Sequence, residues 1–121
     1  MIKKILLVLV LINAVFFSST AWGEILVKDY KKLKQTDKAF IAAYINGVGN
    51  GIDWSNTIMK VKIGNQLYCP PEKLALSVEN YIRILDDEIE KREKSVGFEK
   101  VQEEPIEMDL LLGLLATFPC K

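Results

Sequence analysis

Residues 74–89 read LALSVENYIRILDDEI, and this stretch decides the fold class of the 121-residue chain. Its large apolar side chains recur every three or four residues, which places them on one side of an α-helix for four turns. They are Leu74, Val78, Tyr81, Ile82, Leu85 and Ile89. The helix could begin at Pro71, which suits a first helical position, or after Ser77, which would be its N-cap.

The C-terminal half of this predicted helix is strongly charged. Three acid–base pairs lie four residues apart in the favourable order, namely Asp87 with Lys91, Glu88 with Arg92, and Glu90 with Lys94. Each such pair stabilises a helix by only a few tenths of a kcal/mol. Because so many side chains here are charged, we expect this end of the helix to project into water. The acidic run 86–88 could suggest a cation site, but no glycine turn accompanies it, so a solvated helix face is the better interpretation.

A polar connection and another helix follow. Phe98 is the one large apolar side chain of the connection, and it either folds back on the core or is exposed for a partner. The last helix is predicted to open at Glu103-Glu104-Pro105, with the proline in its first turn, and to stop before Pro119. Its expected buried side consists of Met108, Leu111, Leu112, Leu115 and Phe118.

Upstream, Thr36 is a plausible N-cap for a helix that is apolar nearly all round and should therefore be central. Ala43, Gly47 and Gly51 recur at four-residue spacing, which would let a neighbouring backbone approach closely, either within the bundle or in a homodimer. Residues 57–67 could form a short hairpin or continue this helix to Gly64, and we favour the helix.

A narrow polar stripe of Asn46, Asn50 and Asp53 also runs along this helix. A solvated face is the plain interpretation, and a binding role is the alternative.

The N-terminus has the three-part layout of a signal peptide. Lys3 and Lys4 precede an apolar run, and small residues follow it up to Gly23. The run is shorter than the roughly 18 to 20 residues that span a bilayer. We therefore expect residues 1–23 to be a cleavable signal, with cleavage after Gly23 or Ala21, and residues 24–121 to form one periplasmic domain.

The two cysteines of an exported chain are expected to pair, since export leads to an oxidising compartment. A Cys69–Cys120 bond would close a loop large enough to contribute about 4 kcal/mol by the chain-entropy estimate. The predicted fold is thus a small, all-α, disulfide-stapled bundle of three to four helices. The bond would also make the helices beside it run in opposite directions.

Composition excludes several function classes. Without residues 1–23 the chain has 14 basic and 16 acidic residues, so no basic excess is available to bind nucleic acid. The chain has no histidine, which removes the usual Ser-His-Asp, Cys-His and zinc sites. Ser77 and Lys73 could be imagined as nucleophile and base, but they lie on an ordinary amphipathic helix. We expect a protein that is not an enzyme and uses no cofactor or metal.

Three segments together resemble the Rap/Tai family of immunity proteins. They are AFIAAYINGV at 39–48, YCPP at 68–71 and LLGLLATFPC at 111–120. The resemblance extends from about Lys34 to Cys120. Many members carry a second cysteine pair, and Lys34 and Ile41 stand at the corresponding positions here. The stretch 91–102 is also longer than is usual in the family.

The resemblance implies a small periplasmic helical protein that binds and occludes a peptidoglycan amidase delivered by type VI secretion. In the family a projecting loop or helix end blocks the amidase cleft. The corresponding surface here would use Phe98 as an apolar anchor, with Glu88, Glu99 and Glu104 as polar contacts. The competing surface is the side of the first helix that carries Asn46, Asn50, Asp53 and Trp54. The alternative function is a small disulfide-bonded acid-stress chaperone of the periplasm.

Overall fold

The computed structural model describes residues 1–4 and 23–121. The folded part consists of α2 (Val27–Thr36), α3 (Lys38–Ile63), α4 (Val78–Val96), α5 (Phe98–Val101) and α6 (Ile106–Thr117). The predicted all-α, disulfide-stapled fold is confirmed, and α2 and α5 are helices that the sequence pattern did not predict. Most of the predicted signal peptide lies outside the described residues. None of the helices in the described ranges is long and apolar enough to cross a membrane.

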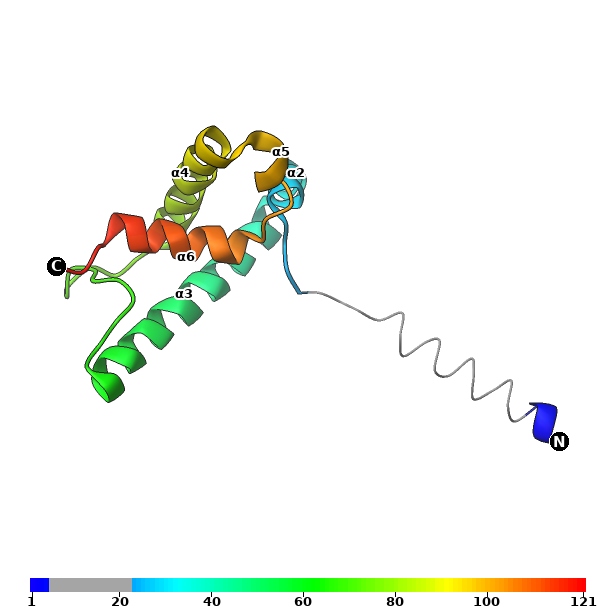
Figure 1. Cartoon of the computed structure of the whole chain (residues 1–121), viewed down its shortest axis with the longest axis horizontal. Helices are drawn as coiled ribbons and strands as arrows, with labels where there is room; N and C mark the ends of the chain where they lie inside the picture. Colours follow the sequence, from blue (N-terminus) through cyan, green and yellow to red (C-terminus); the bar gives the residue numbers. More distant parts are fainter. Residues whose placement is uncertain (5–22) are drawn as a thin grey trace.

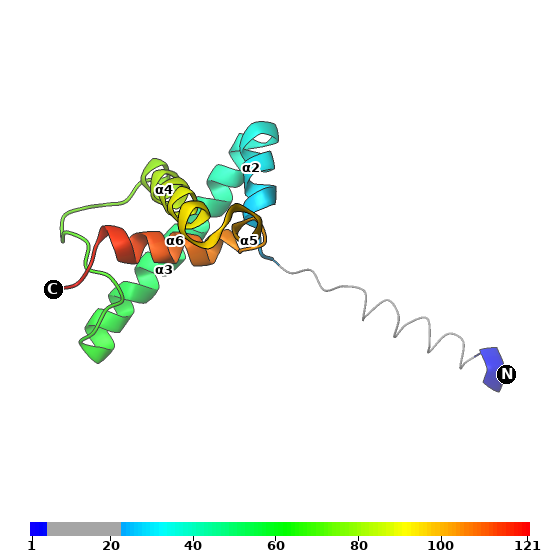
Figure 2. The ribbon, with the colours of Figure 1, turned by 45° about the horizontal axis from the view of Figure 1, so that its top comes forward.

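The helices form a crossed arrangement around α4 and α6 (Figures 1 and 2). The α6 helix lies across both α3 and α4, while α2 and α5 meet at one end of the molecule. The C-terminal part of α3 extends past the other helices in both views, accompanied by the connection 64–77. This long helix is therefore exposed along much of its length.

The α4 helix begins after Ser77, which is the second of the two predicted starts. Ser77 is its N-cap, and its hydroxyl accepts a hydrogen bond from the backbone N–H of Asn80. The Asn80 side chain in turn accepts from the backbone N–H of Ser77 at 3.0 Å, which completes a capping box. Tyr81 and Leu85 are fully buried, whereas Leu74 precedes the helix and is exposed.

The structure shows where α3 ends and which residue is its N-cap. It continues as one helix to Ile63 and ends at Gly64, whose φ of 79° lies in the left-handed region, so the hairpin alternative is wrong. Its N-cap is Asp37, not Thr36, because Thr36 is the last residue of α2. Only one side of α3 is buried, along a line that includes Ile41 and Ile45. The expectation that this helix is central is therefore wrong, because its opposite side is exposed.

The glycines of α3 have different roles from those expected. A Cβ atom added at Gly49 would lie 2.6 Å from the ring of Tyr81, so this glycine is where α4 approaches α3 closely. A Cβ at Gly47 or Gly51 would meet nothing within 4 Å. Of the two alternatives for these glycines, packing inside the bundle is wrong, because their side of α3 faces away from the core.

The α6 helix buries a different side from the one predicted. Its buried residues are Ile106, Asp109, Leu110, Gly113 and Leu114. The predicted set is only half-buried, and Met108 is exposed. Apolar residues occur almost all round this helix, so their spacing does not select a side. Pro105 is the N-cap and lies outside the first turn.

The α4 and α6 helices run in opposite directions, as predicted. Gly113 lies against Ile84 and Glu88, whereas the earlier residue Asp109 lies beside the later residue Arg92.

The Cys69–Cys120 disulfide joins the connection 64–77 to the C-terminal segment that follows α6, and the prediction of this bond is confirmed. The backbone N–H of Cys69 also donates to the Phe118 carbonyl at 2.7 Å. The buried Asn56 holds the same connection against α3, since its amide donates to the Tyr68 carbonyl at 2.8 Å. Its carbonyl oxygen accepts from the backbone N–H of Leu67 at 2.7 Å.

Cys120→Ser should lower the free energy of unfolding by about 4 kcal/mol, because a 51-residue separation leaves a large loop to close in the unfolded chain. Urea denaturation of oxidised wild type and the variant measures this difference. A difference under about 1 kcal/mol would show that the hydrogen bonds of Asn56 and Cys69 fix the connection without the disulfide.

Gly49→Ala should destabilise the protein by about 1 to 3 kcal/mol, because its Cβ would overlap the Tyr81 ring. Gly47→Ala is the matched control in the same helix and should be neutral or stabilising by up to about 1 kcal/mol. Urea denaturation compares the two variants. Equal stability would contradict the proposed close approach of α3 and α4.

Candidate interaction surface

Phe98 lies at an exposed corner of the molecule. Gly97, with φ of 114°, ends α4 in a conformation that favours glycine and turns the chain into α5. The fully buried Val101 anchors α5 to the core, while the Phe98 ring at its first position is 54% exposed. Of the two interpretations of Phe98, exposure is correct and folding back on the core is wrong.

Charged and polar groups surround this ring. The Lys31 ammonium lies 4.8 Å from the ring centroid, which is cation–π distance. Lys31 also forms an ion pair with Glu93, and Gln102 donates to the same carboxylate at 3.0 Å. Burial opposes the charge on Glu93, but the bonds from Lys31 and Gln102 outweigh it and lower the pKa of the carboxyl. These four residues and the exposed Glu99 define the Phe98 corner.

Glu88 and Glu104 do not belong to this surface. Glu88 is only 8% exposed and packs against Gly113 of α6. Both oxygens of Glu104 accept from Arg92, at 2.8 and 2.7 Å. The prediction of these two carboxylates as exposed partner contacts is therefore wrong.

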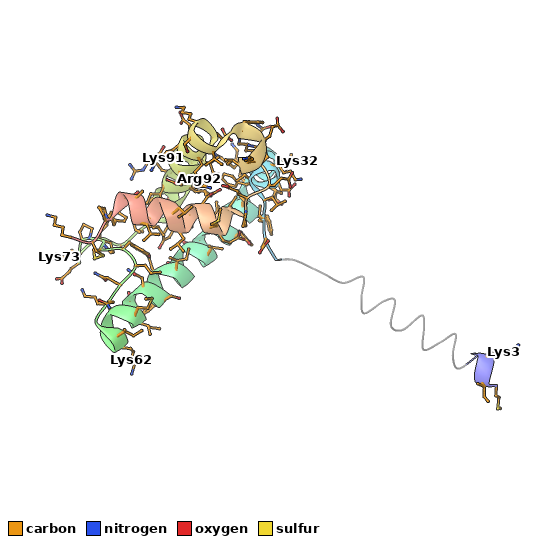
Figure 3. All side chains as sticks on the ribbon, in the orientation of Figure 1. Lys3, Lys32, Lys62, Lys73, Lys91 and Arg92 are labelled. Carbon is orange, nitrogen blue, oxygen red and sulfur yellow. A yellow bond between two sulfur atoms is a disulfide. The ribbon has the colours of Figure 1, made fainter. Side chains whose placement is uncertain are left out.

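The side of α4 that contains positions 88 and 92 forms the seam with α6, which explains this burial. Figure 3 shows the contrast between Lys91, which points away, and Arg92, which points toward the seam. Instead of pairing with Glu88, Arg92 bonds Glu104 just before α6 and lies 3.3 Å from Asp109 of α6. The predicted Glu90–Lys94 pair forms at 2.6 Å.

Asp109 is the most unusual ionisable group of this seam. It is fully buried, and no donor within residues 1–4 and 23–121 hydrogen-bonds either of its oxygens. Arg92 Nε lies 3.3 Å from one oxygen, but that N–H already donates to Glu104. Burial and the neighbouring charge of Glu104 raise the pKa of Asp109 to about 7, with Glu88 contributing in the same direction. We interpret this geometry as one proton shared between Asp109 and Glu104.

Only part of the competing surface on α3 is exposed. Asn46, Asn50 and Trp54 are exposed, and Trp54 retains 69% of its accessible area. Asp53 instead accepts hydrogen bonds from the hydroxyl groups of Tyr68 and Tyr81. Burial, followed by these bonds, raises the pKa of both tyrosines. Asp53 is therefore a structural acceptor between α3, α4 and the connection 64–77.

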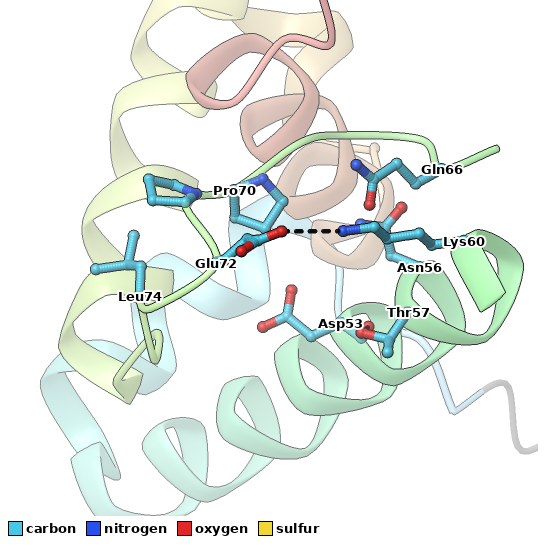
Figure 4. Close-up of a pocket in the computed structure, with 9 residues that line it drawn as sticks. Asp53, Asn56, Thr57, Lys60, Gln66, Pro70, Glu72 and Leu74 are labelled. Atoms are coloured by element: carbon cyan, nitrogen blue, oxygen red, sulfur yellow. Dashed lines mark hydrogen bonds and ion pairs between the residues drawn. The ribbon is translucent and has the colours of Figure 1, made fainter. Parts of the chain in front are cut away.

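A cleft of about 320 Å³ opens between the C-terminal part of α3 and the connection 64–77 (Figure 4). Lys60 and Glu72 face each other across it at 3.9 Å, and Asp53 points into it. Ser77 and Lys73 do not line this cleft, and the Ser77 hydroxyl belongs to the α4 capping box. Among the described residues no group of three His, Cys, Asp or Glu side chains is placed to hold a metal ion.

Sequence reasoning missed Asp109, although a signal was present. Asp109 is the last charged residue before a run of apolar and small residues that extends to Cys120. A charge inside such a helix must be buried or must interrupt an exposed apolar face. The sequence pattern does not show whether Asp109 is buried or exposed, because its burial depends on the position of Arg92.

Family models, curated proteins and solved structures give no match to this chain. The geometry of the molecule therefore carries the functional argument. Its exposed candidates are the Phe98 corner and the side of α3 that carries Trp54.

The shared proton predicts how stability depends on pH. Because folding raises the pKa of Asp109 from 3.8 to about 7, its stabilisation is lost as pH rises through 7. The wild-type protein should therefore be more stable at pH 5.5 than at pH 8, by about 1 to 3 kcal/mol. Asp109→Asn keeps the shape without the charge and should remove most of this difference.

Urea denaturation at the two pH values measures the effect. Asp87→Asn, which changes an exposed carboxyl on α4, is the matched control and should behave as wild type. An equal pH dependence in wild type and Asp109→Asn would contradict the shared proton.

Proposed function

We propose that this protein is a periplasmic immunity protein that binds and occludes a peptidoglycan amidase delivered by type VI secretion. Three sequence features support the proposal: the signal-like N-terminus, the ordered segments at 39–48, 68–71 and 111–120, and the absence of histidine. The stapled helical fold is compatible with it. An inhibitor of this kind requires a rigid scaffold and a complementary surface, and no catalytic group.

The observation that carries the proposal is the Phe98 corner. A large apolar ring surrounded by charged side chains is a common arrangement for the energetic centre of a protein interface. Phe98 is held outward by the buried Val101 and by the turn at Gly97, so its position is fixed before binding. A preformed anchor loses less conformational entropy on association than a mobile one. We therefore place the main contact with the amidase at this corner.

The acid-stress chaperone is the rival function, and it requires the fold to open at low pH. The Asp109 carboxyl acts against this between pH 8 and pH 5, because protonation stabilises its buried form. Glu93 and Glu104 have lowered pKa values, so the stability that they contribute is present above their ordinary pKa and is lost as pH falls through the lowered values. The bundle should thus remain folded through mild acidification, which favours a binder that works near neutral pH.

Phe98→Ala should weaken binding to the cognate amidase about thirtyfold, since truncating an interface anchor typically costs about 2 kcal/mol. The proposal expects a secreted amidase to be encoded beside this gene, and the measurement is inhibition of peptidoglycan cleavage by that amidase at increasing ratios of the two proteins. Ile63→Ala removes an even more exposed apolar side chain outside the Phe98 corner and should leave inhibition unchanged.

Wild-type protein should abolish cleavage at a one-to-one ratio. No inhibition at that ratio would overturn the proposed function. Full inhibition by Phe98→Ala together with loss of inhibition by Trp54→Ala would keep the function and move the contact to α3.

A further inference from the structure

The side of α3 that faces away from the core is apolar along nearly the whole helix. Seven residues at spacings of three and four fall within an arc of about 80°. They are Phe40, Ala43, Gly47, Gly51, Trp54, Ile58 and Val61, and we call them the outer face of α3. No acidic or basic residue occurs among them. An ordinary solvated helix would carry charged residues here.

The structure leaves the outer face uncovered by any described residue of the chain. Its large side chains remain 48 to 74% exposed, with Val61 the most exposed and Phe40 the least. A Cβ atom at Gly47 or Gly51 would meet nothing within 4 Å. Beside these glycines lies an apolar groove of about 440 Å³, lined on its other side by Val48, Ile52 and Leu111. The outer face therefore combines projecting side chains with a hollow next to its small ones.

The order of large and small residues makes this face complementary to itself. We propose that two copies of the chain associate through their outer faces, with the two α3 helices antiparallel about a twofold axis between Asn50 and Gly51. In this register Trp54 of each copy faces Gly47 of the other, Ile58 faces Ala43, and Phe40 faces Val61. Each Trp54 ring then enters the groove beside the partner's Gly47. No charged group of the outer face is buried by the pairing.

The available area supports a second copy as the occupant. From typical side-chain areas, the four large residues present roughly 450 Å² of apolar surface per copy. Two copies would then bury about 900 Å² through these residues alone, before the groove and the polar flanks are counted, which is close to the lower limit for a specific interface. A patch of this size is within the range of the largest apolar patch on a typical monomer, and such patches are often functional. The expected dimer is therefore reversible and depends on protein concentration.

The test uses the full chain expressed with its own N-terminus and purified from the periplasm of the host. Sedimentation equilibrium over a roughly hundredfold concentration range should show a monomer–dimer equilibrium. Trp54→Ala and Gly47→Trp should each weaken the dimer at least tenfold, the first by emptying the groove and the second by opposing two tryptophans. The double variant exchanges large for small on both copies and should recover most of the lost affinity.

The folded monomer should be unaffected, since neither position contacts the core. Circular dichroism of each variant checks this. Ile63→Ala, which removes an exposed apolar side chain outside the outer face, is the matched control and should dimerise as wild type does.

Cross-linking tests the direction of pairing. Asn50→Cys lies beside the proposed axis and should form a cross-linked dimer under oxidation. The two Val61 positions would be about 31 Å apart in the antiparallel register, so Val61→Cys should remain uncrosslinked. Equal cross-linking of both variants would indicate parallel helices and overturn the proposed register.

A monomer at all concentrations would overturn the proposal, as would a dimer that Trp54→Ala and Gly47→Trp leave unchanged. A monomer whose Trp54→Ala variant loses binding to the amidase would assign the outer face to that enzyme instead.

Discussion

Two glycines set how closely α4 approaches the helices on either side of it. Gly49 lets the Tyr81 ring lie directly on the α3 backbone, and Gly113 lets α6 reach Ile84 and Glu88. Both contacts are too short to admit a Cβ without movement of the neighbouring group. Because α4 is placed by these contacts, the side of α4 that contains Glu88 and Arg92 must face α6. The burial of charge in the seam, and the outward position of Phe98 two residues beyond the end of α4, follow from that placement.

The seam shows why a polar group inside this small core is tolerated. Arg92 donates from Nε and one terminal nitrogen to Glu104, which leaves Asp109 without a donor among the described residues. A proton on Asp109 removes the cost of a buried carboxylate without a donor. The neutral carboxyl can donate to Glu104, and it loses little solvation free energy on burial. The same arrangement makes the pairing of α4 and α6 sensitive to pH.

The sequence predicts the elements well where one side of a helix differs from the other. The spacing in 74–89 predicts α4, and its N-cap Ser77 was one of two alternatives. The buried side of α6 was predicted wrongly because Leu111, Leu112 and Leu115 are as apolar as Leu110 and Leu114. Gly47 and Gly51 leave two alternatives open, the bundle and a homodimer, for a related reason: small residues in a row predict a close contact without saying whether the neighbour belongs to the same chain. Phe98 is exposed, as one of its two interpretations predicted, whereas Glu88 and Glu104 are held in the seam, because their burial depends on the position of α6.

The most direct test of the account is protection of living cells from the amidase. A bacterium that exports the proposed cognate amidase to its own periplasm should lyse, and coproduction of the full chain should prevent lysis. The same chain without residues 1–23 should remain in the cytoplasm and give no protection. Lysis that continues when the full chain is present in the periplasm in excess over the amidase would contradict the proposed function.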